Sequence, residues 1–341
     1  MRHPLRIAIL IFAAAASLQA QTPGRPLRIY AIDVEGGKST LYVAPSGESL
    51  LVDTGYADNG NRDANRIVAA ATAAGVKRID YLVITHYHAD HTGGVPQLAA
   101  KMPIGKLFDH GDSFEKSVAK TEEAFEPYAA LRARYPHTVV KPGDTVPIQG
   151  LEVEVVTSAG EAISKPLPGA GQPNPLCASY QALPPDPGEN AHSIGMILTF
   201  GSLRISDLGD LYWNQEHDLA CPVNKLGAID LYMTTHHGTA TSGSPQIVHA
   251  MHPRVAIMNN GADKGGSVLA WTTIETSPGL QDLWQLHYSN AGGRDHNVAD
   301  KFIANPSATD DEGFPLEVVA YRDGTFTVRN PRTGFERTYR K

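Results

Sequence analysis

Residues 81–94 read YLVITHYHADHTGG, and this stretch decides the fold that the sequence predicts. The apolar run 81–84 is typical of a buried strand, and three histidines and one aspartate follow it between positions 86 and 91. Because side chains alternate along an extended chain, His86 and His88 point the same way and can share one metal ion. A turn at Ala89 would bring Asp90 and His91 back toward a second ion. Nitrogen and carboxylate donors without thiolates favour zinc, with manganese or iron as alternatives, over calcium. A chance cluster of polar loop residues is the competing interpretation.

The pattern HxHxDH followed by Thr-Gly-Gly resembles the metal-binding signature of the metallo-β-lactamase superfamily. Within that superfamily the chain is most similar to the competence-protein (ComEC-like) metallo-hydrolase domain. The resemblance implies an α/β (α+β) fold, a four-layered αββα sandwich with the site at the edge of its two sheets. It also implies that His86 and His88 bind one metal, and that Asp90 and His91 bind the other.

The first twenty residues differ from the rest of the 341-residue chain. Two arginines flank a short basic start, an apolar run covers 7–16, and small residues close the segment, which is typical of a secretory signal peptide. We therefore expect a mature domain at 27–341 in the periplasm or outside the cell, with no stable membrane span after cleavage. An uncleaved membrane anchor is the weaker alternative.

Charge and cysteine content restrict the function further. Removing a segment with two arginines and no acids moves the net charge from −7 to −9, which argues against tight non-specific binding of nucleic acids. Cys177 and Cys221 could pair in an exported protein, but two cysteines are too few for a zinc cage.

The mature chain shows the alternation of strands and helices that an α/β sandwich requires. Strands are predicted at 27–34, 39–43 and 49–52, and helices at 61–74 and 114–135. In the superfamily, the aspartate of a segment such as Asp53-Thr54-Gly55 orients the metal-bearing loop, although a turn without any role fits the residues almost as well. Residues 158–190 are rich in proline and glycine, and we interpret them as a flap over the cleft or, alternatively, a passive surface insertion.

Two further candidate ligands follow this insertion. His192 resembles the third histidine of the first metal in hydrolases such as glyoxalase II. The competence-protein subgroup has Asn-x-x-Ser there without that histidine, and Asn190-Ala191-His192-Ser193 satisfies both patterns. Asp210, after a strand and a glycine, matches the superfamily's bridging aspartate, with Asp207 as its competitor.

Histidines near the end of the chain complete the expected site. His236-His237-Gly238-Thr239 resembles an element of the competence-protein domain and of phosphorylcholine esterase; His237 is favoured as the ligand, with the other histidine facing substrate or solvent. The subgroup's later Tyr-Gly-His-Pro is absent, and Lys264-Gly265-Gly266 stands near its place. His287 is a candidate proton donor, or else a half-buried histidine of a strand.

This set of residues predicts hydrolysis. Two ions about 4 Å apart would activate a water, and Asp90 would orient it or relay its proton. The resemblance implies a small or short phosphodiester substrate. The alternatives are a lactone, thioester or β-lactam hydrolase, and a non-catalytic metal-binding module.

Overall fold

The computed structural model describes residues 24–57, 59–307 and 312–341. Most strands of this part of the chain form two large mixed sheets, and β9 and β12 form a short third one. The first sheet has the order β19 (Phe335–Tyr339), β18 (Phe326–Asn330), β17 (Leu316–Ala320), β1 (Leu27–Ala31), β2 (Thr40–Val43), β3 (Ser49–Val52), β4 (Ile79–Val83), β5 (Ile104–Asp109), β6 (His137–Val139). The second has the order β16 (Ile303–Asn305), β15 (Asp282–His287), β14 (Val255–Met258), β13 (Leu231–Met233), β11 (Leu203–Asp207), β10 (Gly195–Phe200), β7 (Glu152–Ser158), β8 (Glu161–Ala162).

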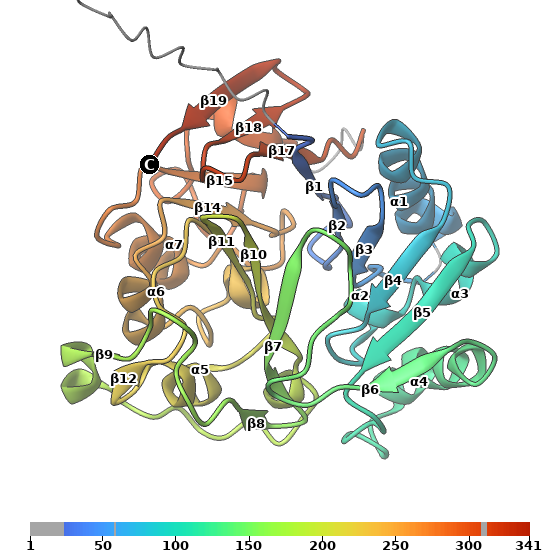
Figure 1. Cartoon of the computed structure of the whole chain (residues 1–341), viewed down its shortest axis with the longest axis horizontal. Coiled ribbons are helices and arrows are strands. Elements are labelled where there is room, and N and C mark those ends of the chain that lie inside the picture. Colours follow the sequence, from blue (N-terminus) through green and yellow to red (C-terminus); the bar gives the residue numbers. More distant parts are fainter. Residues whose placement is uncertain (1–23, 58, 308–311) are drawn as a thin grey trace, which may run out of the picture.

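Helices cover the outer face of each sheet, which gives the layer order αββα (Figure 1). Helices α1 (Arg62–Ala73), α3 (Val95–Ala99) and α4 (Ala119–Arg132) pack on the first sheet. Helices α5 (Trp213–Ala220), α6 (Pro245–Met251) and α7 (Val268–Glu275) pack on the second. The predicted four-layered sandwich is confirmed.

Alternation along the strands explains why two sheets stack. In β1, Leu27, Ile29 and Ala31 belong to the apolar core between the sheets, whereas Tyr30 belongs to the core beneath the helices. Fully burying a Leu or Ile side chain contributes about 1.5–3 kcal/mol, so a strand that is apolar on both faces is stable only between two layers. The C-terminal hairpin joins the same sheet, because β17 runs antiparallel to β1 with Leu27 opposite Ala320.

One predicted helix begins later than expected. The pattern predicts a helix over 114–135, but α4 begins at Ala119 after Val118 in an extended conformation. The reason is that the residues before it make other contacts: Phe114 N donates to Glu189 Oε1 at 2.6 Å, and Thr121 Oγ1 donates to Glu115 Oε2. The tertiary contacts of this segment override its helical periodicity.

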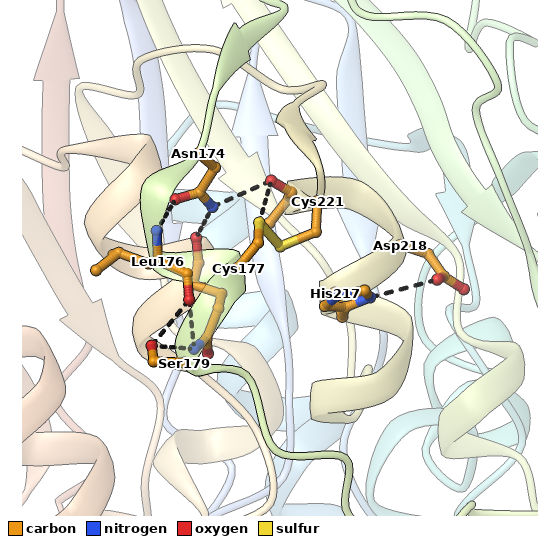
Figure 2. The surroundings of a disulfide bond; sticks show 9 residues. Asn174, Leu176, Cys177, Ser179, His217, Asp218 and Cys221 are labelled. Carbon is orange, nitrogen blue, oxygen red and sulfur yellow. Dashed lines mark hydrogen bonds and ion pairs between the residues drawn. A yellow bond between two sulfur atoms is a disulfide. The ribbon is translucent and has the colours of Figure 1, made fainter.

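The proline-rich segment 158–190 is held firmly against the second half of the chain. Strand β9 (Gln172–Pro173) pairs with β12 (Val223–Asn224), and the 3₁₀ helix η2 (Pro175–Ser179) follows. Figure 2 shows the disulfide between Cys177 and Cys221. The Cα atoms of the two cysteines are 5.7 Å apart, and Asn174 Nδ2 donates to Ala220 O at 3.1 Å. At the end of the segment, Glu189 Oε2 accepts a hydrogen bond from Tyr87 N, which lies in the predicted metal-binding stretch, and contacts His110 Nε2. A flap over the cleft stays a prediction.

The expected signal peptide, residues 1–20, lies outside the described residues. Within the described ranges, every helix is too short or too polar to cross a bilayer.

Candidate metal centre

The His/Asp loop begins after β4 and leads into a short helix, and its Thr85 O accepts a hydrogen bond from Ile194 N, next to β10 of the second sheet. His88 is extended and precedes α2 (Ala89–Thr92), and His91 N donates to His88 O at 3.0 Å. Gly93 and Gly94 have ordinary helical φ values of −58° and −74°. Their lack of a side chain matters for another reason: a Cβ on Gly94 would collide with Thr54 O. The glycines therefore allow close backbone packing, rather than making the turn itself.

Four of the predicted ligands converge in one buried cluster, made of Asp90, His91, Asp210 and His237. Asp210 Oδ2 is 3.1 Å from His91 Nε2 and 3.2 Å from His237 Nε2. Asp90 Oδ2 is 3.2 Å from each of the same two nitrogens. Two imidazole nitrogens and two carboxylate oxygens thus surround one small space.

His86 and His88 meet beside this cluster. His86 Nε2 lies 3.1 Å from His88 Nδ1, and the same His86 nitrogen lies 4.0 Å from Asp210 Oδ2. Asp210 therefore lies near a histidine of each pair, His86 as well as His91 and His237. Among the described residues, its second oxygen, Oδ1, is buried without a hydrogen-bond partner.

Each of these four histidines has its other ring nitrogen next to an oxygen atom. Asp53 Oδ2 lies 2.8 Å from His91 Nδ1, and Asn259 O lies 3.3 Å from His237 Nδ1. Glu115 Oε2 lies 3.3 Å from His88 Nε2, and Thr85 Oγ1 lies 3.1 Å from His86 Nδ1. A histidine that donates one N–H to such an oxygen presents the lone pair of its other nitrogen, which is the usual arrangement of metal-binding histidines. The donor set and its outer partners therefore fit a divalent transition metal.

Asp53 takes the orienting position that the superfamily resemblance implies. Its carboxylate accepts hydrogen bonds from Thr85 N and Thr85 Oγ1, both at 2.8 Å, as well as contacting His91. It is fully buried, and its backbone is left-handed with φ 61°. One aspartate thus fixes both the start of the His/Asp loop and one of its imidazoles.

The electrostatics of the cluster couple its histidines and carboxylates. Burial lowers the pKa of His91, but the carboxylates of Asp210, Asp90 and Asp53 raise it by more, so it lies well above its ordinary value. Burial raises the pKa of Asp210, yet the charges of His237 and His91 hold it well below its ordinary range. A metal ion must displace the proton of His91, so metal affinity increases with pH.

Beneath the cluster lies a buried ion pair between Lys38 and Asp207. Lys38 Nζ contacts Asp207 Oδ1, and Tyr42 OH donates to Asp207 Oδ2 at 3.1 Å. Both charged side chains are almost fully buried, at 1% and 0% exposure. Asp207, the competitor for the bridging position, is therefore committed to an ion pair within the core.

The structure does not bring His192 to the cluster. Its ring stacks on Phe114 with centroids 3.6 Å apart, and its Nδ1 lies 2.7 Å from Gly188 O. The neighbouring Ser193 faces the cluster instead: its Oγ accepts from Asp210 N at 3.1 Å and lies 3.4 Å from His86 Nδ1. The placement follows the Asn-x-x-Ser pattern, and among the described residues no contact joins His192 to the cluster as a third ligand of the first metal.

The two remaining histidines are placed differently from each other. His236 lies at the margin, with Nε2 3.6 Å from Asp210 Oδ2 and Nδ1 3.0 Å from Ser242 Oγ, and burial lowers its pKa to about 4. It is His237, not His236, that joins the four-residue cluster. His287 is buried rather than half-buried, and its Nε2 lies 2.7 Å from Asp33 Oδ1. No contact among the described residues links His287 to the cluster, so its role as a proton donor is unsupported by this geometry.

Sequence reasoning missed two residues of the site. Glu115 contacts His88 from a segment predicted to be helical, and no motif marks it. Lys264 contacts Asp90 Oδ2 through its ammonium group. The only signal for Lys264 is its position near the place where the competence-protein subgroup has a histidine.

Comparison with known proteins finds a family similarity for part of the chain. Residues 32–172 match the family model of the metallo-beta-lactamase superfamily. The matched range contains the whole His/Asp loop, whereas Asp210 and His237 lie beyond it. Residues 32–172, less than half of the chain, are therefore similar to the metallo-β-lactamase superfamily.

Similar curated proteins and solved structures cover different parts of the chain. It is 24% identical over 244 residues to ComE operon protein 3 of Bacillus subtilis, a match that covers 67% of this chain and 28% of that protein. It is 33% identical over 79 residues to an atrochrysone carboxyl ACP thioesterase of Cryptosporiopsis sp. (strain 8999), covering 23% of this chain and 24% of that protein. The chain thus spans about a quarter of the length of either relative. A solved structure, the metallo-beta-lactamase fold protein YhfI from Bacillus subtilis, is 11% identical with a TM-score of 0.48, covering 86% of this chain and 99% of that one.

Proposed function

We propose that this protein is a metal-dependent hydrolase with a dinuclear centre, zinc in the first instance, that cleaves phosphodiesters. The observation that carries the proposal is that Asp210 Oδ2 lies within 4.0 Å of the Nε2 atoms of His86, His91 and His237. His86 and His88 would hold one ion, Asp90, His91 and His237 the other, and Asp210 would be shared. Ions held there supply a water that is nucleophilic at neutral pH and stabilise negative charge on a leaving oxygen.

The chain's own residues supply orientation and proton handling. Asp53 and Glu115 hold His91 and His88 so that Nε2 and Nδ1, respectively, face the centre. The carboxylates of Asp90 and Asp210 are both kept ionised, and each offers an oxygen that can accept a proton from the attacking water. Ser193 Oγ accepts the backbone N–H of Asp210 and thereby fixes the loop that presents this carboxylate.

A phosphodiester is the substrate class we favour, because of the resemblance to the competence-protein domain and because an ammonium group lies at the site. The net charge of −7 argues against long nucleic acids. A thioester is the second candidate, since part of the chain is similar to a thioesterase.

The decisive test is hydrolysis after metal reconstitution. Purified protein loaded separately with zinc, manganese and iron should cleave bis(p-nitrophenyl) phosphate faster than a lactone, a thioester or nitrocefin. If the thioester is cleaved faster, the proposed substrate class changes from phosphodiesters to thioesters. A metal-loaded, folded protein that cleaves none of the four would refute the hydrolase proposal.

We also propose that the protein acts in the periplasm or outside the cell. Supporting this are the signal-peptide pattern and the disulfide Cys177–Cys221, because disulfides persist in oxidising compartments. Mass spectrometry of protein from its native source should show a mature start near Gln21. Intact protein beginning at Met1 in the cytosol would overturn it.

A further inference from the structure

Lys264 brings the ammonium group of a lysine into the candidate metal centre. Its Nζ contacts Asp90 Oδ2 and lies 5.7 Å from the centroid of the Tyr56 ring. The side chain is 36% exposed, whereas that of Asp90 is 11% exposed. The lysine side chain is therefore more accessible to solvent than the carboxylate that it contacts.

The backbone around Lys264 is closely packed on both sides. Gly266 N donates to His237 O at 2.9 Å, and a Cβ on Gly265 would collide with His237 O. On the other side, a Cβ on Gly36 would lie 2.9 Å from the Cβ of Lys264. The base of the side chain is thus fixed beside a metal-ligand candidate, and only its flexible end can change partner.

Metal binding changes what this ammonium group can contact. Asp90 is its ion-pair partner, and a divalent ion held by Asp90 would engage the same carboxylate. A half-buried ammonium group without a counter-charge is costly, so it attracts another anion. We infer that Lys264 is a specificity-determining residue that binds an anionic, non-bridging oxygen of a phosphoryl substrate. The inference rests on the proposed hydrolase function and assigns the substrate a negative charge beside the scissile bond.

Binding of a stable anion tests this contact without turnover. Calorimetry of metal-loaded protein with phenylphosphonate should give a Kd roughly 10- to 100-fold higher for Lys264→Met than for the natural chain, as expected for loss of a charge-assisted hydrogen bond. Lys264→Arg keeps the charge and should recover most of the affinity. Lys101→Met removes an exposed lysine elsewhere and serves as the control.

Metal content of every variant must be measured alongside. An unchanged Kd in Lys264→Met at full metal content would overturn the inference. Weaker binding that merely follows metal loss would also overturn it, because the lysine would then act through Asp90 rather than on the anion.

Kinetics separate this inference from the proposed function. The ratio of kcat/KM for bis(p-nitrophenyl) phosphate, an anion, to that for neutral p-nitrophenyl acetate should fall roughly 10- to 100-fold in Lys264→Met. The leaving group is the same in both substrates. An unchanged ratio in an active enzyme refutes the inference alone, whereas a natural protein inactive on both substrates refutes the proposed function and leaves the calorimetric test of Lys264 standing.

Discussion

Removing Asp207 should destabilise the protein far more than removing a surface acid. Lys38 and Asp207 form an ion pair with 1% and 0% exposure, and Asp207 also accepts a hydrogen bond from Tyr42. Asp207→Ala leaves a buried ammonium group without its partner, which costs about 3–5 kcal/mol in comparable cases. Glu317, whose ion pair with Arg329 is exposed, provides the matched control, and Glu317→Ala should cost at most about 1 kcal/mol.

Urea denaturation of metal-free protein measures these differences without a contribution from metal binding. The double variant Lys38→Met, Asp207→Ala removes both charges, so it should be more stable than Asp207→Ala alone. The reasoning would be refuted if Asp207→Ala cost no more than the Glu317 control. It would equally be refuted if the two single effects simply added in the double variant.

Three further predictions concern other parts of the fold. Glu115→Gln should weaken metal binding by roughly 10- to 100-fold, because Glu115 orients His88. Competition with a chelator measures the metal affinity, and an unchanged affinity would contradict the orienting role of Glu115. Reducing the Cys177–Cys221 bridge, which closes a separation of 44 residues, should lower the free energy of unfolding by about 4 kcal/mol, and a loss below about 1 kcal/mol would count against its stabilising role. Burial raises the pKa of Glu216 from 4.5 to about 7, so the folded state binds this proton more tightly than the unfolded state. Protonated Glu216 therefore contributes about 3 kcal/mol to the free energy of unfolding below pH 4.5, and this contribution is lost as the pH rises to 7. The measurement is the free energy of unfolding of the natural chain and of Glu216→Gln across this pH range. A difference between the two that does not change with pH would contradict the prediction.

The sequence was most informative where candidate metal ligands directly follow the strand that positions them. A buried strand followed by His86, His88, Asp90 and His91 predicts both a sheet edge and a ligand set, because strand alternation and the following turn are local properties. The αββα sandwich was implied by the superfamily resemblance, and the structure confirms it. The same resemblance placed Asp210, because the superfamily's bridging aspartate follows a strand and a glycine.

Long-range packing set the features that the sequence did not reveal. The direction of His192 depends on its stacking with Phe114, a residue 78 positions earlier, and only its neighbour Ser193 can then face the cluster. Glu115 and Lys264 reach the site from separate segments, and each contact depends on tertiary placement rather than on a local pattern. The αL backbone of His236 and His237 likewise follows from the loop that holds them, not from the preference of histidine.

Elemental analysis of the reconstituted protein tests the central claim most directly. The natural chain should hold close to two transition-metal ions, and Asp210→Ala should hold far less metal with its circular dichroism unchanged. Asp207→Ala should keep the natural content in whatever fraction stays folded, because its carboxylate serves Lys38 and Tyr42. A folded natural chain that retains no metal after reconstitution, or an Asp210→Ala variant that retains two ions, would contradict the account.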